Sequence, residues 1–352
     1  MPIIERQHKV TIKDVARSAG VHFTTVSLAL RHHPSIPATT RDRIEEVAKR
    51  LGYTPNAVFS ALSHFRVHGR VRATPPRVAY LVNHSIDDRP HEKTFWEGAR
   101  QQAEMLGYDL ELISVGKGLH DSKSLTRYLK GQNITGVIIA GFEPGLAELK
   151  LDWSDYAIVK INSLHMEPAA TCVSNDQRQD VRIAFREMLA RGYRRIGLAV
   201  GRADEESTQF RHTAGYLVER ASIPPADHIP ELLFPHQAGS ALVSSLMGDW
   251  VRKNKIDAVL CNWSSVGDLL AAAGLSIPKD VACACLCLLG QNTELAGIYP
   301  NLHMVGLKAV SLLTSQLKLG TRGIAEFASS TYVRSQWRDG PSAPFKNPVP
   351  AP

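Results

Sequence analysis

The N-terminal region contains, at residues 11–30, the stretch TIKDVARSAGVHFTTVSLAL. Thr11 and Asp14 have the spacing of a helix N-cap, in which a hydroxyl residue precedes the first turn and an acid lies within it. Apolar residues then recur at helical spacing up to Gly20, and glycine ends helices readily because it adopts positive φ at low cost. A second short helix is expected over residues 23–31. Two short helices joined by a tight turn predict a helix-turn-helix.

The next segment predicts a third helix followed by a break. Pro37 precedes a helical pattern that ends at Gly52. The short stretch 57–65 is too small to be a stable helix alone, so we expect it to order only when something packs on it. These helices form an expected all-α head.

The positive charge of the chain is concentrated in this head. The 352 residues carry a net charge of +7, and residues 1–76 hold 12 basic and 5 acidic side chains, so the whole excess lies there. A basic head on a neutral body predicts that the head binds a polyanion while the body has another role.

Cysteine usage and hydropathy indicate the compartment. The chain has five cysteines, an odd number, and four of them lie between residues 261 and 287. This pattern favours a reducing compartment over a disulfide framework. No apolar stretch is long enough for a membrane span, and the first residues lack the apolar core of a secretory signal. We therefore expect a cytoplasmic protein with no membrane partner.

From residue 77 on, short apolar runs alternate with amphipathic stretches. The expected strands are 78–82, 110–115, 136–140, 157–161, 171–174, 195–200, 232–234, 258–261 and 281–289. The expected helices between them are 95–106, 122–130, 179–190, 209–220 and 240–254. This alternation predicts an α/β core with doubly wound parallel sheets, and its length favours two lobes over one.

Several motifs resemble those of a known family. In the head they are VTIKDVA (10–16), AGV (19–21), TVS (25–27), TR (40–41) and LGYTPN (51–56). In the body they are EGA (97–99), LGY (106–108), TGVII (135–139), VSND (173–176), LARGYRRIG (189–197) and AGY (214–216). The chain thus resembles the lactose-repressor (LacI/GalR) family of bacterial transcription regulators. The resemblance implies a two-lobed, periplasmic-binding-protein-like core that dimerises and binds a small effector.

The resemblance also implies how the head meets DNA. The family's second helix lies in the major groove, and a hinge helix enters the minor groove of a two-fold operator. Base contacts would come from His22, Phe23, Thr24 and Leu28. Phosphate contacts would come from Thr25, Ser27, Tyr53 and Asn56. Leu28 stands where the family usually has an arginine that grips guanine, and His22 replaces a small hydroxyl residue. We therefore expect an operator unlike the commonest one of the family.

Two hinge residues are implied to reach the minor groove. Leu62 matches the leucine that wedges into the central base step, and Phe59 stands where the family usually has alanine. Core packing is the alternative for both. The wedge is favoured for Leu62 because an unsupported hinge offers no core to join, whereas the role of Phe59 stays open. Two hinges ordered together on DNA make a homodimer part of the expected mechanism.

Candidate effector residues follow from the strand ends. Ligands of open α/β lobes bind at the C-terminal ends of strands, which nominates Asn83, Phe142, Asn175, Asp176, Asn262, Trp263 and Gln291. Trp96 is a candidate stacking platform, and the resemblance adds Arg211 and His212. His212, Trp263 and Gln291 replace the family's usual polar anchors, so the cleft takes a different ligand or none. The alternative for each nominee is an ordinary loop, packing or interface residue.

Catalytic, cofactor and metal sites are not indicated. Cys283, Cys285 and Cys287 alternate along an expected strand, and small buried residues are favoured over metal ligands. The sequence lacks a phosphate-binding loop, a nucleophile elbow and a metalloprotease signature. No catalytic residue, cofactor or metal is therefore assigned, and we expect no enzyme.

The organisation and function follow. We expect a head with its hinge (1–65), a linker (66–76), the two-lobed core (77–340) and a proline-rich tail (341–352). The expected function is that of a dimeric, sequence-specific DNA-binding regulator, by default a repressor, modulated by a small molecule such as a sugar. The alternatives are an effector-blind dimeric repressor and an enzyme or solute-binding domain tethered to DNA.

Overall fold

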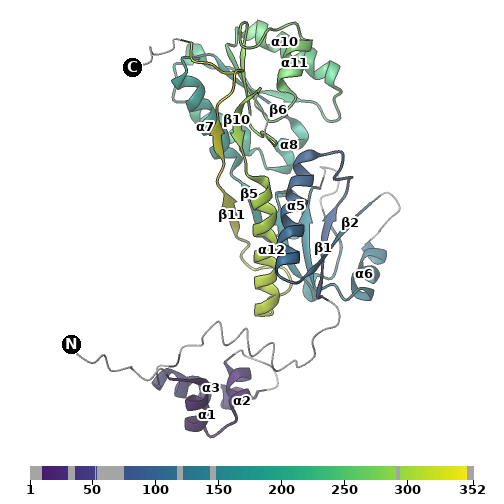
Figure 1. Ribbon diagram of the computed structural model, residues 1–352, viewed down its shortest axis with the longest axis vertical. Coiled ribbons are helices and arrows are strands. Elements are labelled where there is room, and N and C mark those ends of the chain that lie inside the picture. Colours follow the sequence, from purple (N-terminus) through teal and green to yellow (C-terminus); the bar gives the residue numbers. More distant parts are fainter. Residues whose placement is uncertain are drawn as a thin grey trace, which may run out of the picture. The chain divides into compact units, whose positions relative to one another are not determined.

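The chain forms two compact units, Met1–Ala73 and Thr74–Pro352, which we call the head and the core (Figure 1). The computed structural model describes residues 10–30, 36–51, 53, 75–116, 122–142, 148–290 and 294–346. Across these ranges, no helix combines the length and the apolarity that crossing a membrane requires.

The described part of the head contains α1 (Ile12–Ala19), α2 (Phe23–Ala29) and α3 (Ala38–Arg50). At the start of α1, the Asp14 carboxylate accepts hydrogen bonds from the Thr11 backbone N–H at 2.9 Å and from its hydroxyl at 2.6 Å. Gly20 ends α1 with φ +64°, as the sequence predicts. Val15, Val26 and Ile44, one from each helix, are fully buried together. The predicted helix-turn-helix is therefore confirmed.

The first lobe of the core, lobe 1, is built on a parallel sheet in the order β11-β5-β4-β3-β1-β2. Its strands are β1 (Arg77–Val82), β2 (Asp109–Ser114), β3 (Gly136–Ala140), β4 (Ala157–Ile161), β5 (Thr171–Asn175) and β11 (Ser330–Val333). One face packs against α5 (Pro90–Met105) and α12 (Leu302–Leu319), which lie side by side in Figure 1. The other face packs against α6 (Ser122–Gly131) and a short 3-10 helix, Trp153–Asp155.

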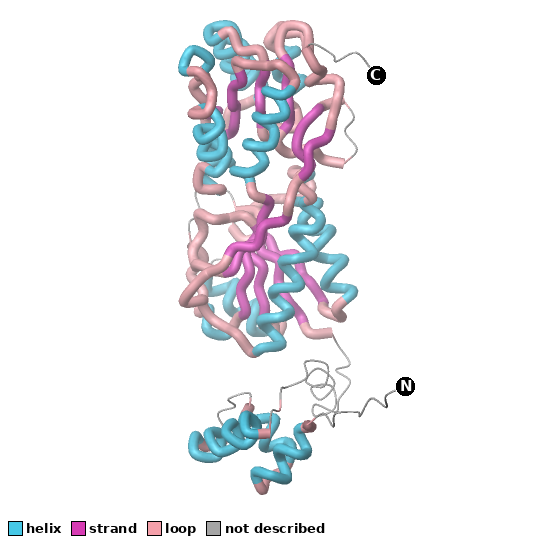
Figure 2. Tube along the Cα trace, turned by 90° about the vertical axis from the view of Figure 1, so that its left-hand side faces the viewer, coloured by secondary structure: helices cyan, strands magenta, loops and turns pink. Residues whose placement is uncertain are grey.

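Lobe 2 repeats this plan with the order β12-β10-β9-β8-β6-β7. Its strands are β6 (Ile196–Gly201), β7 (Leu232–Phe234), β8 (Ala258–Cys261), β9 (Ala282–Cys285), β10 (Ala296–Tyr299) and β12 (Gln336–Arg338), of which β12 is antiparallel. One face is covered by α7 (Gln177–Ala190) and α9 (Arg211–Arg220), the other by α10 (Ser240–Asn254) and α11 (Val266–Ala272). The short α8 (Arg202–Ser207) follows β6, and a 3-10 turn covers Pro225–Asp227. In Figure 2 the strands of each lobe run between helices.

Three chain crossings join the lobes, after β5, after β10 and after β11. The predicted two-lobed core with parallel sheets is confirmed, but each lobe is assembled from distant segments. The sequence patterns did not predict α8, α11, α12, β10, β11 or β12. The expected strand over 281–289 also ends earlier, at Cys285, because the chain turns there toward lobe 1.

The C-terminal segment after β12 packs on lobe 2. Ser342 and Ala343 are buried, and the Tyr193 hydroxyl donates to the Pro344 carbonyl at 2.8 Å. The Lys346 ammonium pairs with Asp257 at 2.6 Å. The core therefore extends at least through Lys346, and the boundary expected at residue 340 falls inside this packed segment.

Candidate DNA interface and inter-lobe site

The start of α2 presents an aromatic pair to solvent. His22 is the N-cap residue, and its Nδ1 lies 2.9 Å from the Thr24 hydroxyl oxygen. The rings of His22 and Phe23 are 4.3 Å apart, and Phe23 is 41% exposed. An exposed helix N-terminus with these side chains suits contacts to base edges or a thymine methyl group.

Two other predicted DNA-contacting residues are only partly exposed. Leu28 and Tyr53 are half-buried against the head's apolar core, and burial raises the pKa of the Tyr53 hydroxyl. Only part of either side chain is therefore available to DNA. Thr25 is half-buried on α2, and Ser27 lies on the same helix. Asn56, Phe59 and Leu62 lie outside the described residues.

Basic side chains surround this apolar core. Five of them are exposed on α1 and α3: Lys13, Arg17, Arg43, Lys49 and Arg50. Arg17 pairs with Asp14 at 3.2 Å across an exposed surface, where such a pair is weak and leaves the guanidinium available. The head thus has the positive surface that phosphate binding requires.

In lobe 2, two predicted effector residues meet on one aspartate. The Oδ2 atom of Asp204 accepts hydrogen bonds from Asn262 Nδ2 at 2.7 Å and from Trp263 Nε1 at 2.9 Å. Asn262 and Trp263 follow β8, as predicted, whereas Asp204 lies on α8 and was not predicted. It is three residues beyond the end of β6, so a strand-end rule with a wider window would have found it.

His212 forms a buried hydrogen-bonded pair with Glu205. Its Nδ1 lies 2.6 Å from Oε1 of Glu205, whose Oε2 accepts the Thr213 backbone N–H at 3.0 Å. Burial acts to raise the pKa of Glu205, but the bonds from His212 and Thr213 outweigh it and hold this pKa below its usual value. His212 therefore joins α8 to α9, which is the packing alternative for this residue.

The predicted effector residues Asn175 and Asp176 lie at the end of β5 and stabilise the crossing from lobe 1 to lobe 2. Asn175 Nδ2 donates to Asp180 Oδ2 at 2.6 Å, and Asp176 caps α7 by accepting the Gln179 backbone N–H at 3.4 Å. Burial raises the pKa of Asp180 to about 6. Nearby, the guanidinium of Arg211 lies 5.2 Å from the ring centre of Tyr332 on β11. Arg211 thus connects the two lobes.

The predicted effector residues of lobe 1 differ in how exposed their side chains are. Phe142 is buried in the lobe 1 core, so its role there is packing and it cannot contact a ligand without rearrangement. Trp96 is half-buried on α5 and packs edge-on against Tyr80, with ring centres 5.2 Å apart. Asn83 is half-buried after β1, with Oδ1 3.3 Å from His84 Nδ1. Gln291 lies outside the described residues.

A buried acid in lobe 1 was not predicted. Glu92 on α5 is 7% exposed, and burial raises its pKa to about 7. Its Oε1 lies 3.7 Å from His91 Nε2, and no hydrogen-bond donor within the described ranges reaches Oε2. A charged residue in the first turn of an amphipathic helix ordinarily faces solvent, so the sequence pattern carried no signal for this one.

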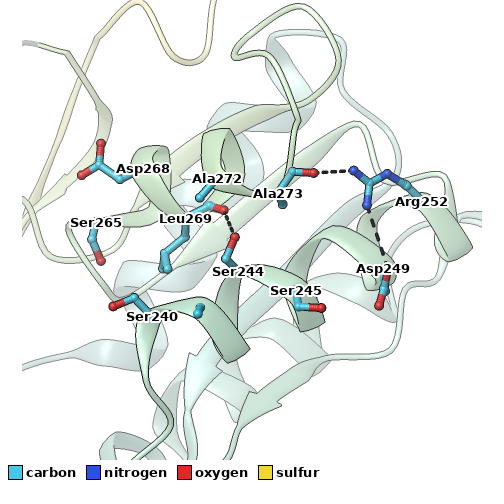
Figure 3. A pocket seen from close by; sticks show the side chains of 11 residues that line it. Ser240, Ser244, Ser245, Asp249, Arg252, Ser265, Asp268, Leu269, Ala272 and Ala273 are labelled. Atoms are coloured by element: carbon cyan, nitrogen blue, oxygen red, sulfur yellow. Dashed lines mark hydrogen bonds and ion pairs between the residues drawn. The ribbon is translucent and has the colours of Figure 1, made fainter.

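A hollow of about 680 Å³ opens on lobe 2 between α10 and α11 (Figure 3). Two of its polar side chains bond to backbone carbonyls within it: the Ser244 hydroxyl donates to the Leu269 carbonyl at 2.7 Å, and Arg252 binds the Ala273 carbonyl. None of the predicted effector residues lines this hollow. In the described part of the chain, no group of three or more His, Cys, Asp or Glu side chains is placed to hold a metal ion.

A helix-turn-helix head and a two-lobed core with three crossings define a class of ligand-responsive DNA-binding regulators. Residues 11–56 match the family model described as bacterial regulatory proteins, lacI family. Residues 76–291, more than half of the chain, match periplasmic binding proteins and sugar binding domain of LacI family. The chain belongs to the lacI family and is a DNA-binding transcription regulator.

Known proteins similar to the chain over most of its length agree with this assignment. Catabolite control protein A of Priestia megaterium is 24% identical over 329 residues, 89% of this chain and 94% of that protein. The HTH-type transcriptional regulator GalR of Salmonella typhimurium strain LT2 is 24% identical over 340 residues, 92% of this chain and 93% of that protein.

Solved structures share the fold. A lac repressor dimer bound to operator and the anti-inducer ONPF matches with a TM-score of 0.58 at 17% identity, covering 96% of this chain and 100% of that chain. A complex of the transcriptional regulator CelR with cellobiose also has a TM-score of 0.58, at 18% identity, covering 95% of this chain and 99% of that chain.

Proposed function

We propose that this regulator is a homodimeric repressor that binds a palindromic operator and responds to a small molecule held between its lobes. The observation that carries the DNA part is the exposed His22–Phe23 pair at the start of α2, within a head rich in exposed cations. A two-fold dimer places two such helices on two half-sites, and occlusion of the operator represses transcription. Such a protein acts in the cytoplasm, at the nucleoid, and we assign it no catalytic activity.

Each part of the head has a role in this proposal. Base edges are contacted by His22, Phe23, Thr24 and Leu28, and phosphates by Thr25, Ser27, Tyr53 and Asn56. Phe59 and Leu62 enter the minor groove from the hinge. In this proposal the DNA-binding part with its hinge spans residues 1–65, the linker spans 66–76, and the two-lobed part runs from residue 77 at least through Lys346.

The effector part of the proposal rests on the strand ends of both lobes. The residues retained as effector contacts or supports are Asn83, Trp96, Asn175, Asp176, Arg211, Asn262, Trp263 and Gln291. Because the lobes are joined by three crossings, a ligand that binds both changes their closure and, through the linker, the pairing of the hinges. The coupling is reciprocal, so an effector that weakens DNA binding binds less tightly to the DNA complex.

A second candidate, an effector-blind repressor, is favoured by a specific observation. The polar nominees Asn262, Trp263 and His212 are bonded to Asp204 and Glu205 of the same lobe. Side chains that satisfy one another need no ligand. In this reading the core serves only to dimerise.

A selection of genomic fragments tests the DNA part of the proposal. The full chain and a shortened chain starting at Arg77 are each used at two salt concentrations. The full chain is expected to recover a short palindrome with steep salt dependence, because phosphate contacts release counterions, and the shortened chain is expected to recover none. Recovery of no specific sequence by either chain contradicts the proposal. Screening metabolites against the isolated complex with that palindrome then separates the effector-responsive repressor from the effector-blind one.

A further inference from the structure

Acidic side chains from both lobes converge where the lobes meet. The Cys287 thiol marks the place, because Cys287 follows β9 of lobe 2 and packs against the apolar core of lobe 1. Burial raises the pKa of this thiol well above its usual value, and Cys285, Asp180, Asp204 and Glu92 raise it further. Such charge effects weaken with distance, so the three carboxylates belong to the surroundings of this thiol.

Glu92 acts on the same thiol, and one of its carboxylate oxygens has no donor among the described residues. Its Oε2 has no hydrogen bond within the described ranges, and neither has the hydroxyl of the fully buried Tyr80, whose pKa is raised by burial and then by Glu92. Gly141 has φ +52°, and a Cβ there would lie 2.6 Å from Glu92 Oε2. The glycine thus leaves room for a carboxylate that nothing described satisfies. Buried polar atoms without partners are rare in folded proteins, so a water, an ion or a ligand group is expected to complete this site.

Titratable and charged groups from several elements surround Glu92. The groups that face it or lie beside it are Tyr80, His84, Arg89, His91 and Cys287. Arg89 lowers the pKa of Glu92 only in part, since burial still holds it at about 7. His91 faces Asp204, but burial lowers the pKa of His91 and so favours its neutral form. Among the described residues, positive charge therefore offsets the burial of Glu92 only in part.

We propose that the effector of this regulator is an organic cation with a protonated amine, which Glu92 of lobe 1 and Asp204 of lobe 2 bind together. The proposal rests on the effector-responsive function proposed above and gives it a ligand class. An ammonium group has three N–H donors and no acceptor, so it can donate to Glu92 Oε2, and its positive charge is also attracted by the Asp204 carboxylate. An anionic metabolite is repelled by the same carboxylates. A cation bound from both lobes favours the closed arrangement.

The test compares ligands that differ in charge on one skeleton. Thermal shift and calorimetry on the full-length protein at pH 7.5 use a compound set of amino sugars, amino alcohols and polyamines, with neutral and carboxylate analogues of each, such as glucosamine, glucose and glucuronate. Stabilisation is expected only from amine-bearing members. Equal or stronger binding by neutral or anionic analogues, or no binding by any amine in the set, overturns the proposal.

Variants locate the site. Glu92→Gln is expected to weaken amine binding at least tenfold, whereas Glu97→Gln, an exposed glutamate on the same helix, is expected to leave it unchanged. Asp204→Asn keeps an oxygen acceptor for Asn262 and Trp263 but removes the charge, and it is expected to weaken amine binding similarly. It therefore serves as the second test if Glu92→Gln fails to fold. Amine binding that survives both substitutions overturns the assignment.

Proton release supplies a second readout. Because the amine favours ionised Glu92, binding near pH 6.5 is expected to release a proton in the wild-type protein and none in Glu92→Gln, as calorimetry in two buffers measures. Operator binding is measured on the same samples. If the wild-type protein binds its operator specifically but binds no amine, this inference alone is overturned. If the wild-type protein does not bind an operator specifically, the proposed function is contradicted.

Discussion

Two buried glutamates, one in each lobe, differ in their hydrogen bonds and in the direction of their pKa shifts. Glu205 of lobe 2 is fully buried, but it bonds to His212 at 2.6 Å and to the Thr213 N–H at 3.0 Å, and its pKa is lowered. Glu92 of lobe 1 is almost as buried, yet its Oε2 has no described donor and its pKa rises to about 7. Burial costs both carboxylates their hydration, and hydrogen bonds and nearby positive charge offset that cost fully only for Glu205. Glu205 is thus satisfied by groups of its own lobe, whereas Oε2 of Glu92 has no described partner.

The largest effect is expected at the satisfied glutamate. Glu205→Ala leaves His212 and the Thr213 N–H buried without their acceptor, and breaking such a buried pair costs about 3–5 kcal/mol of the free energy of unfolding. Urea unfolding measures the loss. Glu206→Ala is the matched control, because its 3.2 Å pair with His236 is exposed and contributes at most about 1 kcal/mol. Equal losses for the two variants would contradict the contrast between a satisfied and an unsatisfied acid.

The unsatisfied glutamate is expected to make stability depend on pH. Because the pKa of Glu92 is raised from 4.5 to about 7, the contribution is fully present below pH 4.5 and is lost as pH rises through 7. The loss approaches about 3 kcal/mol at higher pH, at 1.36 kcal/mol for each pKa unit.

Urea unfolding at pH 5 and pH 8 is the measurement for this second prediction. The fall in stability between the two pH values is expected to be smaller in Glu92→Gln than in the wild type, and Glu97→Gln is expected to behave as the wild type. Asp180, whose pKa is about 6, contributes in the same direction in all three proteins. An identical fall in the wild type and Glu92→Gln would mean that Glu92 is solvated or paired in solution.

The smallest effect is expected at the indole of lobe 2. Trp263→Phe removes one of the two donors to Asp204 while keeping an aromatic ring against Phe234, whose ring centre is 4.9 Å from that of Trp263. The loss of one hydrogen bond costs about 1 kcal/mol, measured by the same unfolding experiment. A loss of stability as large as that of Glu205→Ala would mean that Trp263 stabilises lobe 2 by more than its hydrogen bond to Asp204.

The parts of the fold that the sequence predicted are those with local signals. The helices of the head begin and end near cap residues, and the expected strands over 136–140 and 157–161 coincide with β3 and β4. The return of the chain to lobe 1 through α12 was not predicted. Its place depends on Gly98 and Gly306, which let α5 and α12 approach so closely that a Cβ at either would lie 2.0 Å from a backbone oxygen of the other helix. These glycines are about 200 residues apart, beyond the reach of any local pattern.

The same limit explains the site. The strand-end rule found Asn262 and Trp263, but it also nominated Phe142, because it does not tell which way a side chain turns. It missed Asp204 and Glu92, which lie on helices. Of the three cysteines, Cys283 and Cys285 are buried in the lobe 2 core as expected, but Cys287 lies past the strand and packs against lobe 1.

Short stretches of this sequence are sufficient to specify a helix-turn-helix head and an alternating α/β core, because caps, turns and apolar periodicity act over a few residues. They also locate the positive charge in the head. Local sequence patterns do not specify the partners of the buried charges. Glu205 faces a histidine, whereas Oε2 of Glu92 has no donor among the described residues, and this difference depends on which elements pack together. Contacts between distant segments form only when the sheets and helices assemble.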